Sequence, residues 1–344
     1  MLNILIYIIY DMNLHNSPGL LRVKAMRNGS IKKQDENMHK AIRKKVEALY
    51  TREHVLIAVL DSGLGGVSIC AELEKALGAH ALFKQASLIY FNIWPEQGRG
   101  YNSLDSVSER VRVFDRALQG VCDVQPDLIM IACNTLSVIY DRTPFSSNTS
   151  IPVIDIVDFG VDLIHSNMKE NADSQTLITG TRTTISENAH LRKLIQKGID
   201  ASRIATQACH GVATEIEKNP QGEAVERLID AYMDEASKKL GKRGTVYVAL
   251  CCTHFAYSQH VFHDKLGDRL SMAVVLLNPN TEMSGFLFKN VHPILSSTSE
   301  TQVKMVSKIH LEQSKLLSMS RAVSATSVKT AAALMGYTYQ PDLF

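Results

Sequence analysis

The sequence has few aromatic residues, little net charge and no apolar segment long enough to cross a membrane. Phe, Trp and Tyr make up 6% of the 344 residues, and only one of them is Trp. The 37 basic and 35 acidic side chains leave a formal charge of +2. There is therefore no overall basic field to hold nucleic acid or an anionic membrane. The N-terminal apolar segment 2–10 is too short to span a bilayer. We expect neither nucleic acid nor a membrane among the partners of this protein.

Cysteine is scarce as well. Six cysteines in a chain of this length are too few for a disulfide framework, and a bond between the adjacent Cys251 and Cys252 would be strained. We therefore expect reduced thiols and a cytoplasmic location. No CxxC pair occurs, and Cys251, Cys252 and His254 do not have the usual spacing of zinc ligands. The sequence predicts no metal site.

Short apolar runs alternate with amphipathic stretches from Val55 onward, in a chain long enough for two domains. This alternation is typical of parallel strands joined by crossover helices, so the sequence predicts an α/β fold. The predicted strands are 55–60, 87–91, 127–132, 153–154, 175–179, 203–208, 245–250 and 272–277. Residues 1–50 are mostly polar after the first ten, and we expect them to form an extension outside the main fold.

Two segments have the alternating three- and four-residue spacing of an amphipathic helix. They are 104–118, with apolar side chains at 104, 107, 111, 114 and 118, and 223–239. A further helix is expected within 297–319, packed on the first domain or forming a dimer surface. The tail 321–344 has no pattern that predicts its structure.

Polar, reactive residues follow four of the predicted strands. They read Asp-Ser-Gly-Leu-Gly-Gly at 61–66, Cys-Asn-Thr at 133–135, Gly-Thr-Arg-Thr-Thr at 180–184 and Cys-Thr-His at 252–254. In parallel sheets, binding sites collect at the carboxyl ends of the strands. Asp61 precedes Cys133 by 72 residues, and Gly180 precedes Cys252 by the same number. This spacing suggests two similar α/β halves that face each other across one cleft.

Each junction also has a simpler interpretation. The glycine-rich turn 63–66 could cradle a phosphate, but it matches no nucleotide-binding fingerprint and Asp61 would repel the ligand, so a tight turn is the alternative. Cys133 and Cys252 could be buried packing residues. They could instead be activated thiols, because hydrogen-bond donors and a helix N-terminus follow each of them. A nucleophile–base pair with His254, as in thiol hydrolases, leaves the second cysteine without a role.

Together the four junctions resemble the aspartate/glutamate racemase family, and most closely its glutamate racemases. The matching stretches are DSGLGG at 61–66, ACNT at 132–135, GTRTT at 180–184 and CCTHF at 251–255, with ACHGVATEIE at 208–217 as a weaker match. The resemblance implies two pseudo-symmetric α/β domains with mainly parallel sheets and an active site between them. The expected bounds are 51–152 with 274–320 for the first domain and 153–273 for the second.

The resemblance also implies a chemistry: racemisation of an acidic amino acid, most closely glutamate, without pyridoxal phosphate or another cofactor. In that family one cysteine thiolate and one thiol work on opposite faces of the α-carbon. Cys133 and Cys252 match these two cysteines, and the resemblance implies that Cys133 works on the D form and Cys252 on the L form. Asp61 and His254 match the residues that assist them, and Glu217 matches an acid near the histidine. The implied substrate-binding residues are Ser62, Asn134, Thr135, Thr181, Thr184, Thr253, Gly98, Arg99 and Gly100.

The substrate loop departs from the family pattern. Residues 92–102 read NIWPEQGRGYN, and Gly98, Arg99 and Gly100 occupy the place of a Pro-Tyr-Gly segment that binds the distal carboxylate of glutamate in the family. Arg99 is either an exposed side chain or a cleft residue that pairs with a distal carboxylate. Aspartate racemases and maleate or hydantoin isomerases remain alternatives, as does a catalytically silent binding protein. Family members are often dimers, so the expected partners are a small amino acid and a second copy of the chain.

Overall fold

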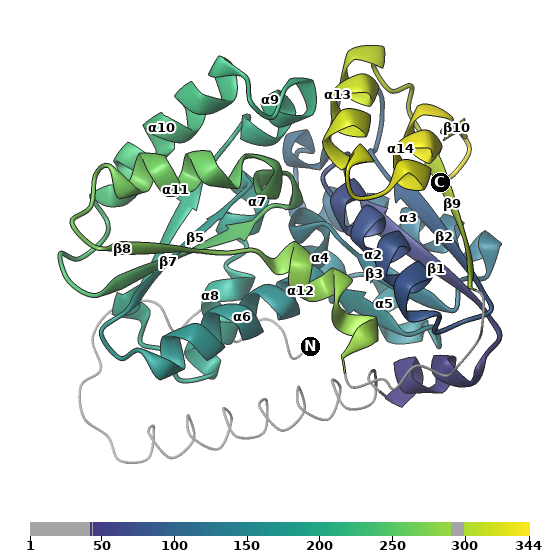
Figure 1. Ribbon diagram of the computed structural model, residues 1–344, viewed down its shortest axis with the longest axis horizontal. Coiled ribbons are helices and arrows are strands. Elements are labelled where there is room, and N and C mark those ends of the chain that lie inside the picture. The colour runs from purple at the N-terminus through teal and green to yellow at the C-terminus, as the bar shows by residue number, and fades with distance from the viewer. Residues whose placement is uncertain (1–41, 43, 290–298) are drawn as a thin grey trace. The chain divides into compact units, whose positions relative to one another are not determined.

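Two parallel sheets carry the fold. The computed structural model describes residues 42, 44–289 and 299–344, within a unit that runs from 42 to 344. In this part of the chain, six strands form one sheet in the order β10-β9-β2-β1-β3-β4, and four form a second sheet in the order β6-β5-β7-β8 (Figure 1). Every strand pairing in both sheets is parallel.

The observed strands confirm the prediction that the apolar runs form strands. The first sheet contains β1 (His54–Asp61), β2 (Gln85–Asn92), β3 (Leu128–Ile131), β4 (Val153–Asp155), β9 (Glu300–Ser307) and β10 (Thr338–Tyr339). The second contains β5 (Gln175–Gly180), β6 (Ile204–Ala208), β7 (Thr245–Cys251) and β8 (Ala273–Leu277). All eight predicted strands are present, and β9 and β10 are additional.

Helices cover both faces of each sheet. On the first sheet, one face packs on α2 (Val67–His80), α12 (Pro279–Ser284), α13 (Gln313–Ser324) and α14 (Val328–Met335), and the other on α3 (Val107–Val121), α4 (Asn134–Tyr140) and α5 (Pro144–Asn148). The second sheet packs on α6 (Ile156–Glu170) and α8 (Ala189–Gln196) on one face, and on α9 (Val212–Lys218), α10 (Glu223–Ser237) and α11 (Gln259–Gly267) on the other. The short α7 (Arg182–Ser186) follows β5.

Strand β1 shows why its sequence is an unbroken apolar run. Ile57 and Val59 face the core beneath α2, whereas Ala58 and Leu60 face the core on the α3 side, and all four are fully buried. A strand covered on both faces needs apolar side chains at consecutive positions instead of alternating ones. The run ends at Asp61, where the polar cleft begins.

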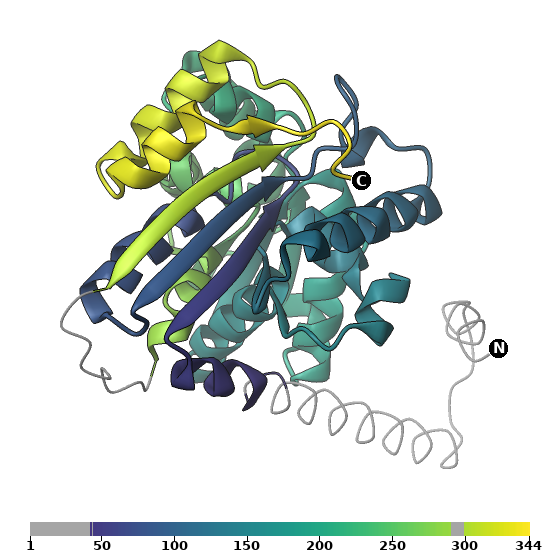
Figure 2. The same ribbon diagram turned by 90° about the vertical axis from the view of Figure 1, so that its right-hand side faces the viewer.

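The helix expected within 297–319 is wrong over its first half. Residues 300–307 form β9, which pairs with β2 over its whole length, and α13 begins only at Gln313. Figure 2 shows β9 beside β2, which in turn lies beside β1. The segment alternates between polar residues and Thr301, Val303 and Met305, which is the two-residue period of a strand. In so short a segment this period cannot be told from the period of a helix. Residues 297–298 lie outside the described part.

The expected domain limits also differ from the sheets. Strand β4 pairs with β3, so the chain leaves the first sheet after Asp155, and β8 pairs with β7, so it leaves the second sheet only after Leu277. The tail 321–344 belongs to the fold, since it completes α13 and forms α14 and β10. Its buried Leu334 and Leu343 supply the apolar contacts that hold it.

The extension expected over 1–50 packs on the fold in its last part. Val46 and Leu49 are buried in the core of the first sheet. Tyr50 Oη donates a hydrogen bond of 3.0 Å to the carbonyl oxygen of Leu287. Residues 1–41, which include the apolar segment 2–10, lie outside the described residues.

Helix α3 offers a test of this core. The fully buried Phe114 packs edge-on against Tyr101, with ring centroids 6.4 Å apart, whereas Arg112 on the same helix is exposed. We expect Phe114→Ala to lower the free energy of unfolding by about 3–5 kcal/mol, because it leaves a cavity. Arg112→Ala should change it by less than about 0.5 kcal/mol. Urea unfolding followed by circular dichroism measures both, and equal effects would contradict the assigned core.

Candidate active site

The four polar junctions meet in one cleft. A cavity of about 430 Å³ is lined by residues that follow strands of both sheets. Asp61 ends β1 and Cys133 follows β3 in the first sheet. Thr181 follows β5 and Cys252 follows β7 in the second sheet. Because both sheets are parallel, each brings two junctions to one edge, and the two edges form opposite walls of the cleft.

Most of the site residues expected from the sequence line this cavity. They are Asp61, Ser62, Gly98, Gly100, Cys133, Asn134, Thr135, Thr181, Cys252, Thr253 and His254. Thr184 stands behind the wall, with its Oγ1 3.0 Å from Thr181 Oγ1. Arg99 does not line this cavity either.

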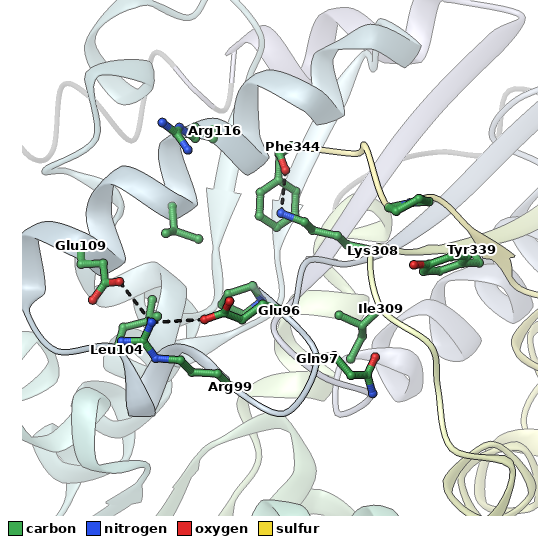
Figure 3. A pocket seen from close by; sticks show the side chains of 13 residues that line it. Glu96, Gln97, Arg99, Leu104, Glu109, Arg116, Lys308, Ile309, Tyr339 and Phe344 are labelled. Carbon is green, nitrogen blue, oxygen red and sulfur yellow. Dashed lines mark hydrogen bonds and ion pairs between the residues drawn. The ribbon is translucent and has the colours of Figure 1, made fainter.

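Arg99 faces away from the cleft, contrary to the expectation for a substrate-binding residue. Its guanidinium pairs with Glu96, Asp105 and Glu109 at 3.2, 3.0 and 3.5 Å. Figure 3 shows it turned toward Glu96 and Glu109 in a second cavity of about 450 Å³ on the other side of the loop. These three carboxylates hold the guanidinium outside the cleft. The sequence of the loop alone does not reveal that they, and not a substrate, pair with Arg99.

The surroundings of Cys133 favour its protonated form. It is the N-cap residue of α4 and is 5% exposed, and its Sγ lies 3.1 Å from Ser62 Oγ. Burial, reinforced by the negative charge of Asp61, raises the pKa of the Cys133 thiol. A buried sulfur beside a carboxylate keeps its proton, since both surroundings disfavour a second negative charge.

Asp61 connects the two walls. Its Oδ2 accepts hydrogen bonds from Gly66 N–H in the following turn (2.7 Å) and from Thr253 Oγ1 in the opposite wall (2.8 Å). Burial raises the pKa of Asp61, while His254 and these two donors oppose the rise. The carboxyl group therefore depends on the opposite wall for part of its stabilisation.

Cys252 has the opposite surroundings. Its Sγ lies 3.8 Å from His254 Nδ1, and His254 Nε2 lies 2.9 Å from Glu217 Oε1. Burial alone would lower the pKa of His254, but its hydrogen bonds to Cys252 and Glu217 raise that pKa well above the usual value. A protonated imidazole next to the sulfur stabilises negative charge on Cys252.

Glu217 has partners from three parts of the chain. Besides His254, its Oε1 accepts a hydrogen bond of 3.0 Å from Leu64 N–H, and its Oε2 lies 3.5 Å from Lys315 Nζ on α13. Burial would raise the pKa of Glu217, but His254 and Lys315 lower it below the usual value. The ionised carboxylate of the second wall is thus held by groups that come from the first.

Hydroxyl and amide groups line the floor between the two sulfurs. Thr135 Oγ1 lies 2.9 Å from Thr181 Oγ1, a further link between the two walls. Asn134 is 2% exposed, and both its side-chain oxygen and its side-chain nitrogen lack a hydrogen-bond partner among the residues that the structure describes. Buried polar atoms are normally paired, so an unsatisfied amide in a cleft is suited to a polar ligand.

The glycine-rich turn is explained by close packing of the walls. A Cβ atom on Gly65 would lie 2.3 Å from Thr253 Oγ1 and 2.5 Å from His254 Nδ1. A Cβ on Gly63 would lie 2.9 Å from Glu217 Oε1. Only glycine lets the opposite wall approach this closely, which accounts for the turn without a bound phosphate.

Sequence reasoning missed several residues that line the cleft. They are Asn92, Trp94, Tyr101 and Asn102 in the substrate loop, and His310, Glu312 and Lys315 near the start of α13. The loop residues carry no motif. Lys315 lies 61 residues beyond His254, in a segment that was expected to pack on the first domain or form a dimer surface, so no local signal identifies it.

The remaining site expectations concern thiols, metals and membranes. The six cysteines are free, as expected for reduced thiols. Within residues 42–289 and 299–344, no group of three or more His, Cys, Asp or Glu side chains is arranged to hold a metal ion. None of the helices described is long and apolar enough to cross a membrane.

Known proteins with similar sequences are racemases. The chain is 29% identical over 203 residues to a glutamate racemase of Helicobacter acinonychis, covering 58% of this chain and 71% of the relative. It is 24% identical over 240 residues to the glutamate racemase of Staphylococcus carnosus, covering 69% of this chain and 83% of the relative.

Solved structures share the fold. Glutamate racemase from Francisella tularensis, crystallised with D-glutamate, superposes with a TM-score of 0.62 at 22% identity, over 78% of this chain and 94% of that one. The Bacillus anthracis isoform RacE1 gives a TM-score of 0.61 at 20% identity, over 84% and 97%. At these identities the likeness shows the fold alone. The two-sheet architecture is thus that of the glutamate racemases.

The family model described as Asp/Glu/Hydantoin racemase matches residues 57–277, which include Asp61, Cys133, Thr181, Cys252 and His254. This match covers more than half of the chain, and the cleft described above lies within it apart from the residues near the start of α13. The chain belongs to the Asp/Glu/Hydantoin racemase family.

Proposed function

We propose that this isomerase interconverts the L and D forms of an acidic amino acid, glutamate, with Cys133 and Cys252 as the two acid/base groups. The observation that carries the proposal is the contrast between the two sulfurs. One is buried beside a carboxylate and the other lies beside a protonated histidine, and both line the same cleft from opposite walls.

Racemisation needs a base on one face of the α-carbon and an acid on the other. From the L form, the Cys252 thiolate removes the α-proton and becomes a thiol, and the electron pair stays on the planar carbanion. The Cys133 thiol then gives its proton to the opposite face and becomes a thiolate. The D form leaves, and the reverse reaction runs through the same two sulfurs in the opposite order.

The neighbouring groups fit these roles. A protonated His254 is suited to stabilise a thiolate at Cys252, and Asp61 disfavours a thiolate at Cys133 until the reaction creates one. The unpartnered amide of Asn134 and the hydroxyls of Thr135 and Thr181 are suited to the amino and α-carboxylate groups of the substrate.

Glutamate is proposed as the substrate because of the relatives. The curated neighbours are glutamate racemases, and the Francisella tularensis structure holds D-glutamate. The sequence alternatives, aspartate and maleate or hydantoin substrates, are tested in the same experiment. A binding protein without activity would have no reason to hold two thiols in such different surroundings.

Replacing either cysteine should stop inversion. We expect Cys133→Ala and Cys252→Ala each to reduce racemisation of L-glutamate roughly 100-fold or more, because each removes one of two acid/base groups. Proton NMR in D₂O measures loss of the α-proton, and chiral chromatography measures the D form. The half-exposed Cys122, outside the cleft, provides the control, and Cys122→Ala should keep full activity.

Three results would contradict this proposal. Full racemisation by either cysteine variant would exclude the two-cysteine mechanism. Exchange with aspartate but not with glutamate would change the substrate. An absence of α-proton exchange with every acidic amino acid tested would exclude acidic amino-acid racemisation itself.

The raised pKa of His254 predicts a pH dependence. The imidazolium is present below this pKa, and its support of Cys252 is lost as the pH rises through it. Glu217→Gln removes a negative charge that helps to raise the pKa of His254, so the alkaline limb of kcat/KM for L-glutamate should move to lower pH. Glu215→Gln on the same helix is the control, because Glu215 pairs with Lys218 and not with His254. An unchanged alkaline limb in Glu217→Gln would show that His254 does not control it.

A further inference from the structure

The charges that face the cleft are unbalanced. Three carboxylates line it, those of Asp61, Glu217 and Glu312. Among the lining residues that the structure describes, Lys315 is the only Lys or Arg. An acidic amino acid with its charged amino and α-carboxylate groups brings a further net negative charge into this space. A charge that leaves water needs a partner of opposite sign, and the cleft offers few.

Lys315 is positioned between one fixed partner and one exchangeable partner. Its Nζ lies 3.5 Å from Oε2 of the buried Glu217 and 3.3 Å from Oε1 of Glu312. The Glu312 side chain is 61% exposed and lies three residues before Lys315. Exposed pairs of this kind contribute little to stability, so a substrate carboxylate can replace Glu312 at little cost.

The ammonium group is connected to the Cys252 sulfur of the second wall through two side chains. Lys315 contacts Glu217, Glu217 contacts His254, and His254 contacts Cys252. Helix α13 packs against α9, which carries Glu217, so the lysine is held at the meeting point of the two walls (Figure 1).

The substrate loop does not compete for this role. Gly98 and Gly100 line the cleft but have no side-chain charge, and Arg99 is held outside by its three carboxylates. A charged partner for an acidic side chain is therefore not supplied by Gly98, Arg99 or Gly100, whereas Lys315 lines the cleft.

We infer that Lys315 is the specificity-determining residue of this enzyme: it pairs with the side-chain carboxylate of the substrate, displacing Glu312, and so selects acidic amino acids. This inference rests on the proposed function. The competing role for Lys315 is purely structural, as a counter-ion that holds Glu217 in place against His254.

Glutamate and glutamine separate these roles, because they have nearly the same shape and differ in the charge of the side-chain end. Wild type, Lys315→Met and Lys315→Arg are compared with each, by α-proton exchange in D₂O and, where glutamine is not turned over, by its inhibition constant against glutamate. Lys315→Met should lower kcat/KM for glutamate roughly 10- to 100-fold, mainly through KM, as expected for loss of a charge-assisted hydrogen bond. The kcat/KM or inhibition constant for glutamine should stay unchanged in Lys315→Met. Lys315→Arg should retain most of the preference for glutamate.

Two further variants sharpen the test. Glu312→Gln frees Lys315 from its exchangeable partner and should lower KM for glutamate. Lys308→Met is the matched control, because Lys308 lies on the same segment but lines the neighbouring cavity, with its Nζ 3.8 Å from the centre of the Phe344 ring (Figure 3). It removes a nearby positive charge and should leave the preference for glutamate intact.

The outcomes distinguish the inference from the proposed function. Equal losses for glutamate and glutamine in Lys315→Met would overturn the inference and assign the lysine to Glu217 alone. A higher KM for glutamate in Glu312→Gln, or an equal loss of preference in Lys308→Met, would also overturn it. If wild type exchanges glutamate normally, these results leave the racemase proposal in place. If wild type exchanges no acidic amino acid, both the inference about Lys315 and the racemase proposal are wrong.

Discussion

The site depends on buried carboxylates that are stabilised across the cleft. Asp61 belongs to the first sheet and accepts a hydrogen bond from Thr253 of the second, and Glu217 belongs to the second and accepts one from Leu64 N–H of the first. A buried carboxylate without such donors is costly, so each wall is completed by the other. The glycine at position 65 is required because any side chain there would force the walls apart.

This reciprocal arrangement gives the two cysteines different chemical surroundings, although the two halves have a similar structure. Cys133 and Cys252 follow equivalent strands, β3 and β7, yet one has a carboxylate as neighbour and the other an imidazolium. A similar backbone therefore places two sulfurs at equivalent strand ends, and the residues around each sulfur give it a different electrostatic environment. Repetition gives the two sulfurs similar positions, and divergence between the halves gives them different neighbours.

Much of this could be predicted from the sequence, because it depends on local pattern. Apolar runs mark the buried strands, and polar turns after them mark the cleft, so Asp61, Cys133 and Cys252 could be identified without a structure. Arg99 could not be placed, because its orientation depends on Glu109, which lies on a helix that follows the loop. Lys315 and β9 could not be placed either, since both depend on pairing between segments far apart in the chain.

The position of β9 has a consequence for how the protein is made. Strand β9 lies beside β2, although more than 200 residues separate Gln85 from its partner Glu300, and the whole second sheet is formed from the chain between them. Contacts this distant in sequence slow folding, because a long loop must close before they form. On the ribosome, both cysteines emerge well before β9 and Lys315. A nascent chain that ends after β8 thus contains Cys133 and Cys252 but neither β9 of the first sheet nor Lys315, the cation beside Glu217.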